Sequence, residues 1–183
     1  MNVQRAIEQR RSIRRYKDEP VSNEHLQLLL EAARLAPTGS NTQAGRFIVV
    51  TDNEMRRKVA KVSHDQKWMT RAPLFIVCVA DPRSRLPEGL LCVDEHSPEF
   101  ELKQSIRDVA IQAEHIVLQA EELGLGTCWI AWFIQEEIRP VLSVPDDKFV
   151  VAVLLVGHPD EVPAARPRLA LSDIVYREEW GKK

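Results

Sequence analysis

The sequence has few cysteines, and their spacing suits neither a disulfide framework nor a metal site. Three occur among 183 residues, namely Cys78, Cys92 and Cys128, and no two of them form a CxxC pair. An odd number of widely separated cysteines argues against a disulfide scaffold and is typical of a protein kept in a reducing compartment. We therefore expect a cytoplasmic protein without structural disulfides.

Long hydrophobic stretches are also missing. No apolar run approaches the roughly 20 residues that span a bilayer. The N-terminal segment MNVQRAIEQRR lacks the apolar core of a secretory signal. The net charge is −2, so the surface as a whole does not attract polyanions. These absences predict one domain over residues 1–183 that binds neither membranes nor nucleic acids.

Familiar catalytic motifs are scarce. The sequence has no GxSxG, no Walker loop and no GxGxxG, and GLGTCW at 124–129 has too few glycines for a dinucleotide turn. CVDEH at 92–96 lacks a second Cys or His cluster of matching spacing, which favours a solvated loop over a metal site. Cys128 stands beside Trp129 and Ile130 and resembles a buried apolar thiol. We expect no catalytic side chain and no metal.

Apolar periodicity predicts helices that alternate with short buried strands. Helical spacing predicts helices at residues 3–10, 22–36, 52–62, 102–123 and 135–142. Short β-branched or continuously apolar runs predict strands at 46–51, 74–80, 126–133 and 148–157. The segment 81–101 carries three prolines and no sustained period, which predicts a long loop or lid. The alternation is typical of an α/β or α+β fold.

Positive charge is concentrated near the N-terminus, where the sequence reads RRSIRRY. Guanidinium groups and a hydroxyl bind phosphate well, and Arg10, Ser12 and Arg14 point the same way on an extended segment. Arg166 and Arg168, two residues apart, form a second basic pair near the other end of the chain. The alternatives are a phosphate site formed by both pairs, a nucleic-acid patch and a solvated run of charge.

The segment APTGSNTQAGRF, at 36–47, joins a helix to a strand through small and polar residues. Such a turn can lie against a planar heteroaromatic ligand and form hydrogen bonds with its edge. The alternative is a helix C-cap followed by an ordinary turn.

In this order, these segments resemble the FMN-dependent nitroreductase family along nearly the whole chain. The resemblance rests on RRSIRRY at 10–16, EAARLAPTGSNTQAGRFIVV at 31–50, RAPLFIVCVAD at 71–81, DVAIQAEHIVLQAEELGLGTCWIAWF at 108–133, VVAVLLVGHP at 150–159 and ARPRLALSDIVYREEW at 165–180. It implies an α+β three-layer sandwich with a mainly antiparallel central sheet flanked by helices. It also implies an intertwined homodimer with FMN at its interface.

The resemblance assigns cofactor contacts to four segments. The arginine-rich segment and the C-terminal basic pair hold the FMN 5′-phosphate, with one arginine beside the ribityl chain or the ring. The turn after the second helix packs on the flavin from the partner subunit, and backbone N–H groups after the third strand approach flavin N5. The implied phosphate contacts are Arg10, Ser12, Arg14, Arg166 and Arg168, and the arginine beside the ribityl chain or the ring is Arg11. The implied residues of the turn are Pro37, Thr38, Ser40 and Asn41. Those after the third strand are Ala131 and Trp132.

The sequence departs from the family pattern at two places. Ala44 and Gly45 follow Gln43 where many members have Pro-Trp, and Ala131 and Trp132 stand where many members have two glycines. Trp132 is bulky, so we expect it to narrow the face on which substrates stack.

The implied activity is an FMN-dependent NAD(P)H oxidoreductase with ping-pong hydride transfer to nitroaromatics, quinones or similar electron-poor acceptors. A flavin carries the redox chemistry, which explains why no acid–base pair stands out. Two alternatives stay open. One is an FMN enzyme of the same fold with a specialised reaction, such as reductive dehalogenation, flavin fragmentation or dehydrogenation. The other is a non-enzymatic module that binds a phosphate ligand or nucleic acid.

Overall fold

Four β-strands form one sheet in the computed structural model, which describes residues 2–183. The sheet order is β1-β2-β4-β3, and each neighbouring pair is antiparallel. The strands are β1 (Gly45–Val50), β2 (Leu74–Ala80), β3 (Gly126–Ile130) and β4 (Phe149–Gly157). Each lies where the sequence predicts a strand, except that β3 ends at Ile130 rather than at residue 133.

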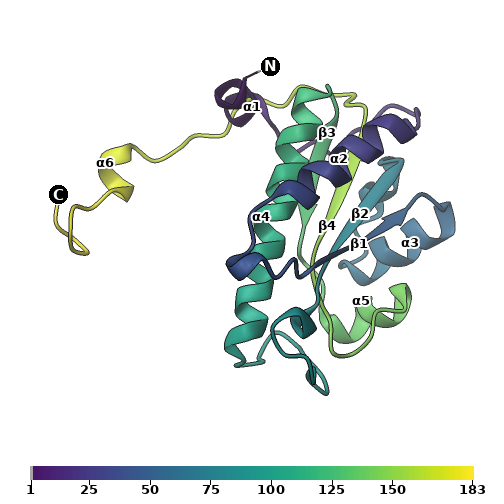
Figure 1. Ribbon diagram of the computed structural model, residues 1–183. Helices are drawn as coiled ribbons and strands as arrows, with labels where there is room; N and C mark the ends of the chain where they lie inside the picture. Colours follow the sequence, from purple (N-terminus) through teal and green to yellow (C-terminus); the bar gives the residue numbers. More distant parts are fainter. Residues whose placement is uncertain (1) are drawn as a thin grey trace.

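Helices cover both faces of the sheet and complete three layers (Figure 1). The helices are α1 (Val3–Gln9), α2 (Asn23–Leu35), α3 (Asn53–Val62), α4 (Phe100–Glu122), α5 (Gln135–Leu142) and α6 (Leu171–Ile174). Helices α2 and α4 pack on one face, and α3 and α5 pack on the other. The expected α+β sandwich with an antiparallel central sheet is confirmed.

Strand β2 explains this layering because it is buried along its whole length. Side chains alternate across a strand. Ile76 and Cys78 therefore join the core beneath α2 and α4, whereas Phe75 and Val77 join the core beneath α3 and α5. A strand buried on both faces is continuously apolar in sequence, as LFIVCVA is at 74–80.

Side-chain caps fix the starts of two helices where the sequence predicts them. Ser22 accepts a hydrogen bond from the backbone N–H of His25, and Asp52 accepts one from the backbone N–H of Met55. These caps satisfy N–H groups that the first helical turn leaves unpaired. Local sequence thus determines where α2 and α3 begin.

The segment 81–99 is irregular apart from a short 3-10 turn, and α4 begins at Phe100, two residues before the predicted start of that helix. An ion pair of 2.7 Å between Arg83 and Asp147 holds its first part. Farther along, the Glu95 carboxylate accepts a hydrogen bond of 2.9 Å from the backbone N–H of Gln135, at the start of α5. The segment is therefore attached to the body of the fold at separate points, and its role as a lid stays a prediction.

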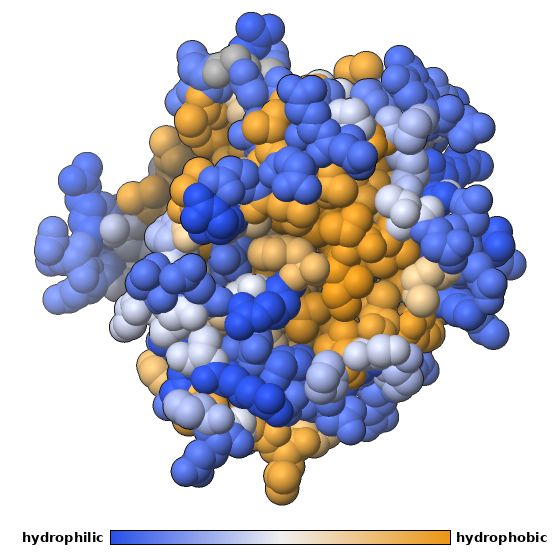
Figure 2. All heavy atoms as spheres, turned by 45° about the vertical axis from the view of Figure 1, so that its right-hand side comes forward, coloured by the Kyte–Doolittle hydropathy of each residue, from blue (hydrophilic) through white to orange (hydrophobic). Residues whose placement is uncertain are grey.

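Two apolar surfaces stand out on this chain. The C-terminal tail leaves the body of the fold (Figure 1), and its exposed apolar residues are Leu169, Leu171, Ile174, Val175 and Trp180. The side that carries β1 comes forward in Figure 2 and shows a broad apolar area. A groove of about 310 Å³ beside β1 is lined in part by Val49 and Leu142. Large contiguous apolar areas mark interaction surfaces.

Among the described residues, 2–183, no helix has both the length and the apolar character that a membrane crossing requires. Helix α4, which has 23 residues, carries charged and polar side chains along its length.

The side chain of Gln135 forms hydrogen bonds with the backbone of Val150 in β4, as a neighbouring strand would. Its replacement tests how much these bonds contribute to the stability of the fold. Its side-chain amide donates to the carbonyl of Val150 at 3.0 Å and accepts from the N–H of Val150 at 2.8 Å, at a position that is 1% exposed. We expect Gln135→Leu to lower the free energy of unfolding by about 3 kcal/mol, because two buried backbone groups lose their partner. Urea unfolding at a fixed protein concentration measures this change.

The matched control is Glu136→Gln, which changes the exposed neighbour in the same helical turn. This substitution should alter the free energy of unfolding by less than about 0.5 kcal/mol. Equal losses in the two variants would show that the Gln135–Val150 pair does not stabilise the fold.

Candidate functional site

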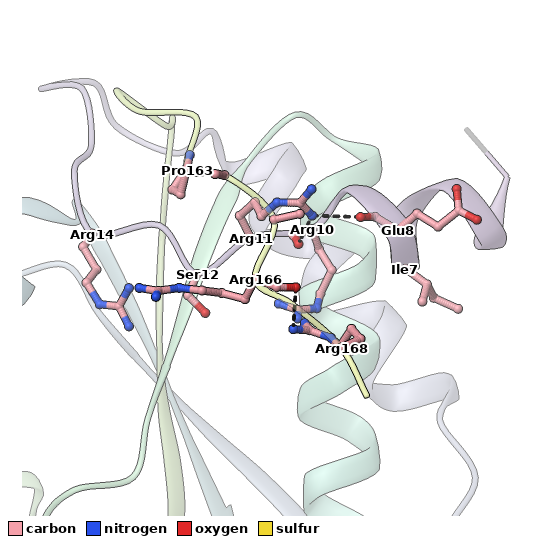
Figure 3. A pocket seen from close by; sticks show the side chains of 11 residues that line it. Ile7, Glu8, Arg10, Arg11, Ser12, Arg14, Pro163, Arg166 and Arg168 are labelled. Atoms are coloured by element: carbon pink, nitrogen blue, oxygen red, sulfur yellow. Dashed lines mark hydrogen bonds between the residues drawn. The ribbon is translucent and has the colours of Figure 1, made fainter. Parts of the chain in front are cut away.

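A pocket of about 510 Å³ lies between the N-terminal arginine-rich segment and the C-terminal basic pair. Figure 3 shows side chains from both segments converging there, although most of the chain separates them in sequence. The predicted residues that line the pocket are Arg10, Arg11, Ser12, Arg14, Arg166 and Arg168. The structure therefore brings together the two arginine pairs that the sequence suggested for one anion.

Buried anchors hold the arginine-rich segment beside the sheet. Ile13 and Tyr16 are buried, whereas Ser12 and Arg14 are exposed, so alternation along the segment points the polar side chains outward. The backbone N–H of Ile13 donates to the carbonyl of Thr127 in β3 at 2.8 Å. The Tyr16 hydroxyl donates to the carbonyl of Ile13 at 2.7 Å. Burial raises the pKa of Tyr16, so this hydroxyl stays protonated and continues to donate.

An acidic side chain joins the two segments that supply the arginines. The Glu161 carboxylate accepts hydrogen bonds from the backbone N–H groups of Arg14 at 2.6 Å and of Arg15 at 3.2 Å. The backbone N–H of Asp160 donates in turn to the carbonyl of Arg15 at 3.0 Å. These bonds fix the distance between the two walls of the pocket.

The arginines differ in how far the chain already satisfies them. Arg11 donates through Nη1 to the carbonyls of residues 8–10 at 2.8, 2.9 and 2.8 Å, and thus caps the end of α1, whose last carbonyls lack helical partners. The guanidinium of Arg14 instead lies 5.7 Å from the centre of the Trp68 ring. A cation–π contact occupies the face of a guanidinium and not its N–H edge. Arg14 is therefore better suited than Arg11 to bind an anion.

The donor set of the pocket fits a phosphate group. Several arginines line the same pocket as the exposed Ser12, and guanidinium groups bind phosphate oxygens through paired hydrogen bonds. Burial raises the pKa of Glu114 and of Glu121 on α4. The positive charge of Arg10 opposes the rise at Glu114, and the charges of Arg11 and Arg10 oppose it at Glu121. The residues present thus supply the charge and the donors that the 5′-phosphate of the expected FMN requires.

The turn after α2 lies outside this pocket. It contains the 3-10 turn Gly39–Asn41, in which Ser40 and Asn41 have φ values of 54° and 55°. Within residues 2–183, none of the predicted residues Pro37, Thr38, Ser40 and Asn41 lines the arginine pocket. In a single chain, the turn and the arginines therefore form separate features.

Ala131 and Trp132 also lie outside the pocket, exposed just after β3. The Trp132 ring stacks on the ring of His64, with centroids 4.0 Å apart and planes inclined by 23°. A His64 ring nitrogen, Nδ1, lies 3.0 Å from the Trp132 carbonyl oxygen. These contacts hold a bulky side chain at a position where the family resemblance leads us to expect glycine.

His64 and Trp68 contact two of the predicted site residues, Trp132 and Arg14, and the sequence did not predict them. Both belong to the segment 63–73, which carries no clear apolar period. The structure forms a 3-10 turn there, Lys67–Arg71, and fully buries Met69. The sequence feature that could have indicated them is the presence of a histidine and a tryptophan within a short polar stretch.

The cysteines differ in exposure, because Cys78 and Cys128 are buried and Cys92 is exposed. Burial raises the pKa of Cys78 to about 12. Burial also raises the pKa of Cys128, against the lowering effect of Arg14. The described part of the chain contains no group of three or more His, Cys, Asp or Glu side chains placed to hold a metal ion.

Comparison with known proteins gives consistent matches. The sequence model described as "Nitroreductase family" matches residues 7–158. An "FMN reductase [NAD(P)H]" of Bacillus subtilis is 30% identical over 97% of this chain and 74% of its own length. A "Putative NADH dehydrogenase/NAD(P)H nitroreductase" of Archaeoglobus fulgidus is 32% identical over 93% of this chain and 94% of its own length.

Solved structures agree with these matches. NfrA2 of B. megaterium has a TM-score of 0.87 and 33% identity, over 99% of this chain and 76% of that chain. The NADPH:FMN oxidoreductase from Vibrio harveyi, complexed with NAD+, has a TM-score of 0.86 and 25% identity, over 100% of this chain and 80% of that chain.

Thiol labelling tests the exposure of the cysteines. We expect iodoacetamide at pH 8 to modify Cys92 in the native protein and to leave Cys78 and Cys128 unmodified. A raised pKa keeps a thiol protonated at this pH, and the thiolate is the reactive form. Mass spectrometry of tryptic peptides identifies the modified residue, and Cys92→Ser should abolish labelling until the protein is unfolded. Labelling of Cys128 as fast as Cys92 would contradict the assignment.

Proposed function

The chain belongs to the nitroreductase family, and on this premise we propose that it is an FMN-dependent NAD(P)H oxidoreductase. The observation that carries the proposal is the convergence of Arg10, Ser12, Arg14, Arg166 and Arg168 on one pocket. Relatives named FMN reductase and NADPH-flavin oxidoreductase support the same cofactor and the same class of donor. The proposed acceptors are small electron-poor molecules, such as nitroaromatics and quinones, which replace the donor in a ping-pong sequence.

Different residues of this chain have different roles in binding FMN. Arg14 and Arg168 hold the phosphate through charge-assisted hydrogen bonds, and the Ser12 hydroxyl donates a further bond. Arg11 keeps α1 in place. Arg168 also donates through Nη1 to backbone carbonyls, those of Arg166 and Pro167 at 3.2 Å each, so it would bind an anion through its other N–H groups. When bound, FMN supplies the hydride chemistry, so the protein needs no acid–base pair of its own.

We further propose that the enzyme is an intertwined homodimer with FMN at the subunit interface. The turn at Pro37–Asn41 is separate from the arginines of its own chain, and a partner copy would supply the second half of the site. The exposed apolar residues of the tail, such as Ile174 and Trp180, support an exchange of tails. Strand β1 lies at the sheet edge beside an apolar groove, and such edges accept added chains.

Trp132 favours a restricted set of acceptors. Its side chain is 63% exposed and is held by the stack on His64. In the proposed dimer this ring stands beside the flavin and limits the size of the molecules that stack there. The alternative of an FMN enzyme with a specialised reaction is supported by this same residue, because a restricted pocket favours a specific substrate. We place the enzyme in the cytoplasm, because its free thiols suit a reducing compartment.

The visible absorbance spectrum of the purified protein tests the proposed function directly. We expect bound flavin that is bleached anaerobically by NADH or NADPH and is reoxidised by a quinone such as menadione. Flavin that neither donor bleaches would favour the specialised reaction. A protein that stays colourless after FMN is added would overturn the proposal.

Substitutions in the pocket test the phosphate site. We expect Arg14→Ala and Arg168→Ala each to raise the Kd for FMN about ten- to hundredfold, because each loses charge-assisted bonds worth roughly 1.5–3 kcal/mol. Fluorescence titration of the apoprotein measures the Kd. Arg57→Ala, which changes an exposed arginine of α3 outside the pocket, is the control. Full flavin retention in both pocket variants would show that the phosphate lies elsewhere.

A further inference from the structure

We propose that Arg85 and Asp108 are positioning residues of the flavin site, because their ion pair holds the turn at residues 38–43 in its binding shape. The inference rests on the proposed function, in which this turn packs on the flavin of the partner subunit. Arg85 follows the 3-10 turn at the start of the segment 81–99, and Asp108 lies within α4.

The two side chains bind both backbone polar groups of one residue of the turn, Gly39. Arg85 Nη2 lies 2.7 Å from Asp108 Oδ2 and also donates to the Gly39 carbonyl at 3.2 Å. The backbone N–H of Gly39 donates to Asp108 Oδ1 at 3.0 Å. The Thr42 hydroxyl donates to Asp108 Oδ2 at 3.4 Å. The turn is therefore bound to a helix and to a loop that are remote from it in sequence.

Burial makes this ion pair more than a surface contact. The Arg85 and Asp108 side chains are 14% and 7% exposed. Removing two charges from water costs about as much as their attraction returns, so a buried pair is weak evidence of stabilisation. This pair adds little net stability, yet it binds both the N–H and the carbonyl of Gly39. It is therefore better explained by the backbone shape that it imposes.

The shape is one that the chain does not adopt readily. Ser40, Asn41 and Gln43 have φ values of 54°, 55° and 52°, in the left-handed region that side chains with a Cβ disfavour. Such residues persist where the surroundings over-determine the backbone, and they cluster at binding sites. Thr38 adds one local bond, because its hydroxyl oxygen accepts from the backbone N–H of Gln43 at 3.1 Å. The Arg85–Asp108 pair supplies the long-range contacts.

The space around Gly39 shows how closely Arg85 packs on the turn. A Cβ at this position would lie 2.7 Å from Arg85 Nη2, closer than real Cβ contacts allow. A side chain at this position would therefore have to move the guanidinium that packs on the glycine. A Gly39→Ala substitution displaces Arg85 without removing either charge.

Comparison of FMN with riboflavin gives the decisive experiment, because riboflavin has the ring and lacks the phosphate. We expect the double variant Arg85→Met/Asp108→Leu, which leaves no buried charge unpaired, to raise the Kd for both ligands by the same factor of about ten. Arg14→Ala should raise the Kd for FMN alone. Arg83→Met is the matched control, because Arg83 belongs to the same loop and pairs instead with Asp147; it should change neither Kd.

Hydrogen exchange of the turn amides separates this inference from the proposed function. Faster exchange of the Gly39 and Gln43 N–H groups in the double variant, with unchanged circular dichroism, supports the pair as the element that holds the turn. Unchanged exchange, or unchanged affinity for both ligands, would overturn the inference. If the double variant does not fold, Gly39→Ala undergoes the same measurements with the same criteria. Failure of the wild-type protein to bind FMN would overturn the proposed function, and exchange at the turn would still decide whether the pair holds it.

Discussion

The site depends on how closely Ile13 and Tyr16 approach the ends of two strands. A Cβ on Gly126 would lie 2.6 Å from Ile13 Cγ1, and a Cβ on Gly157 would lie 2.9 Å from Tyr16 Cδ1. Because these approaches leave no room for a side chain, the arginine-rich segment reaches the sheet only where β3 begins and β4 ends in glycine. The burial of these two anchors then determines where Arg14 projects.

Electrostatics sets the second constraint, since arginines gathered at one place repel each other. Part of this repulsion is offset within the chain. Arg11 faces the carbonyl end of α1, Arg15 pairs with Asp160 at 3.5 Å, and Glu161 binds backbone N–H groups of the same segment. Exposed pairs of this kind are individually weak. The positive charge that remains faces the pocket. Binding of an anion with two negative charges lowers the repulsion among these arginines more than binding of a singly charged anion.

The sequence predicts the local features well because they depend on neighbouring residues. Caps such as Ser22 and the continuous apolar run of β2 place elements within a few residues of their observed bounds. The sequence also suggested that the arginine-rich segment and the pair of Arg166 and Arg168 meet around one anion, because both concentrate positive charge in a few residues. The stack of Trp132 on His64 and the bonds from Asp108 to the turn were not accessible, because they join residues far apart in sequence that share no period.

The position of the tail has a thermodynamic consequence. Arg168 lines the pocket, and the next residue, Leu169, is 70% exposed at the root of the tail. In the proposed dimer, Arg168 therefore contacts the cofactor and the adjacent Leu169 contacts the partner chain. FMN binding and dimerisation are then thermodynamically coupled. By mass action, whatever favours one association favours the other, and dilution weakens both. The fraction of molecules that carry flavin would then depend on how much of this protein the cell makes.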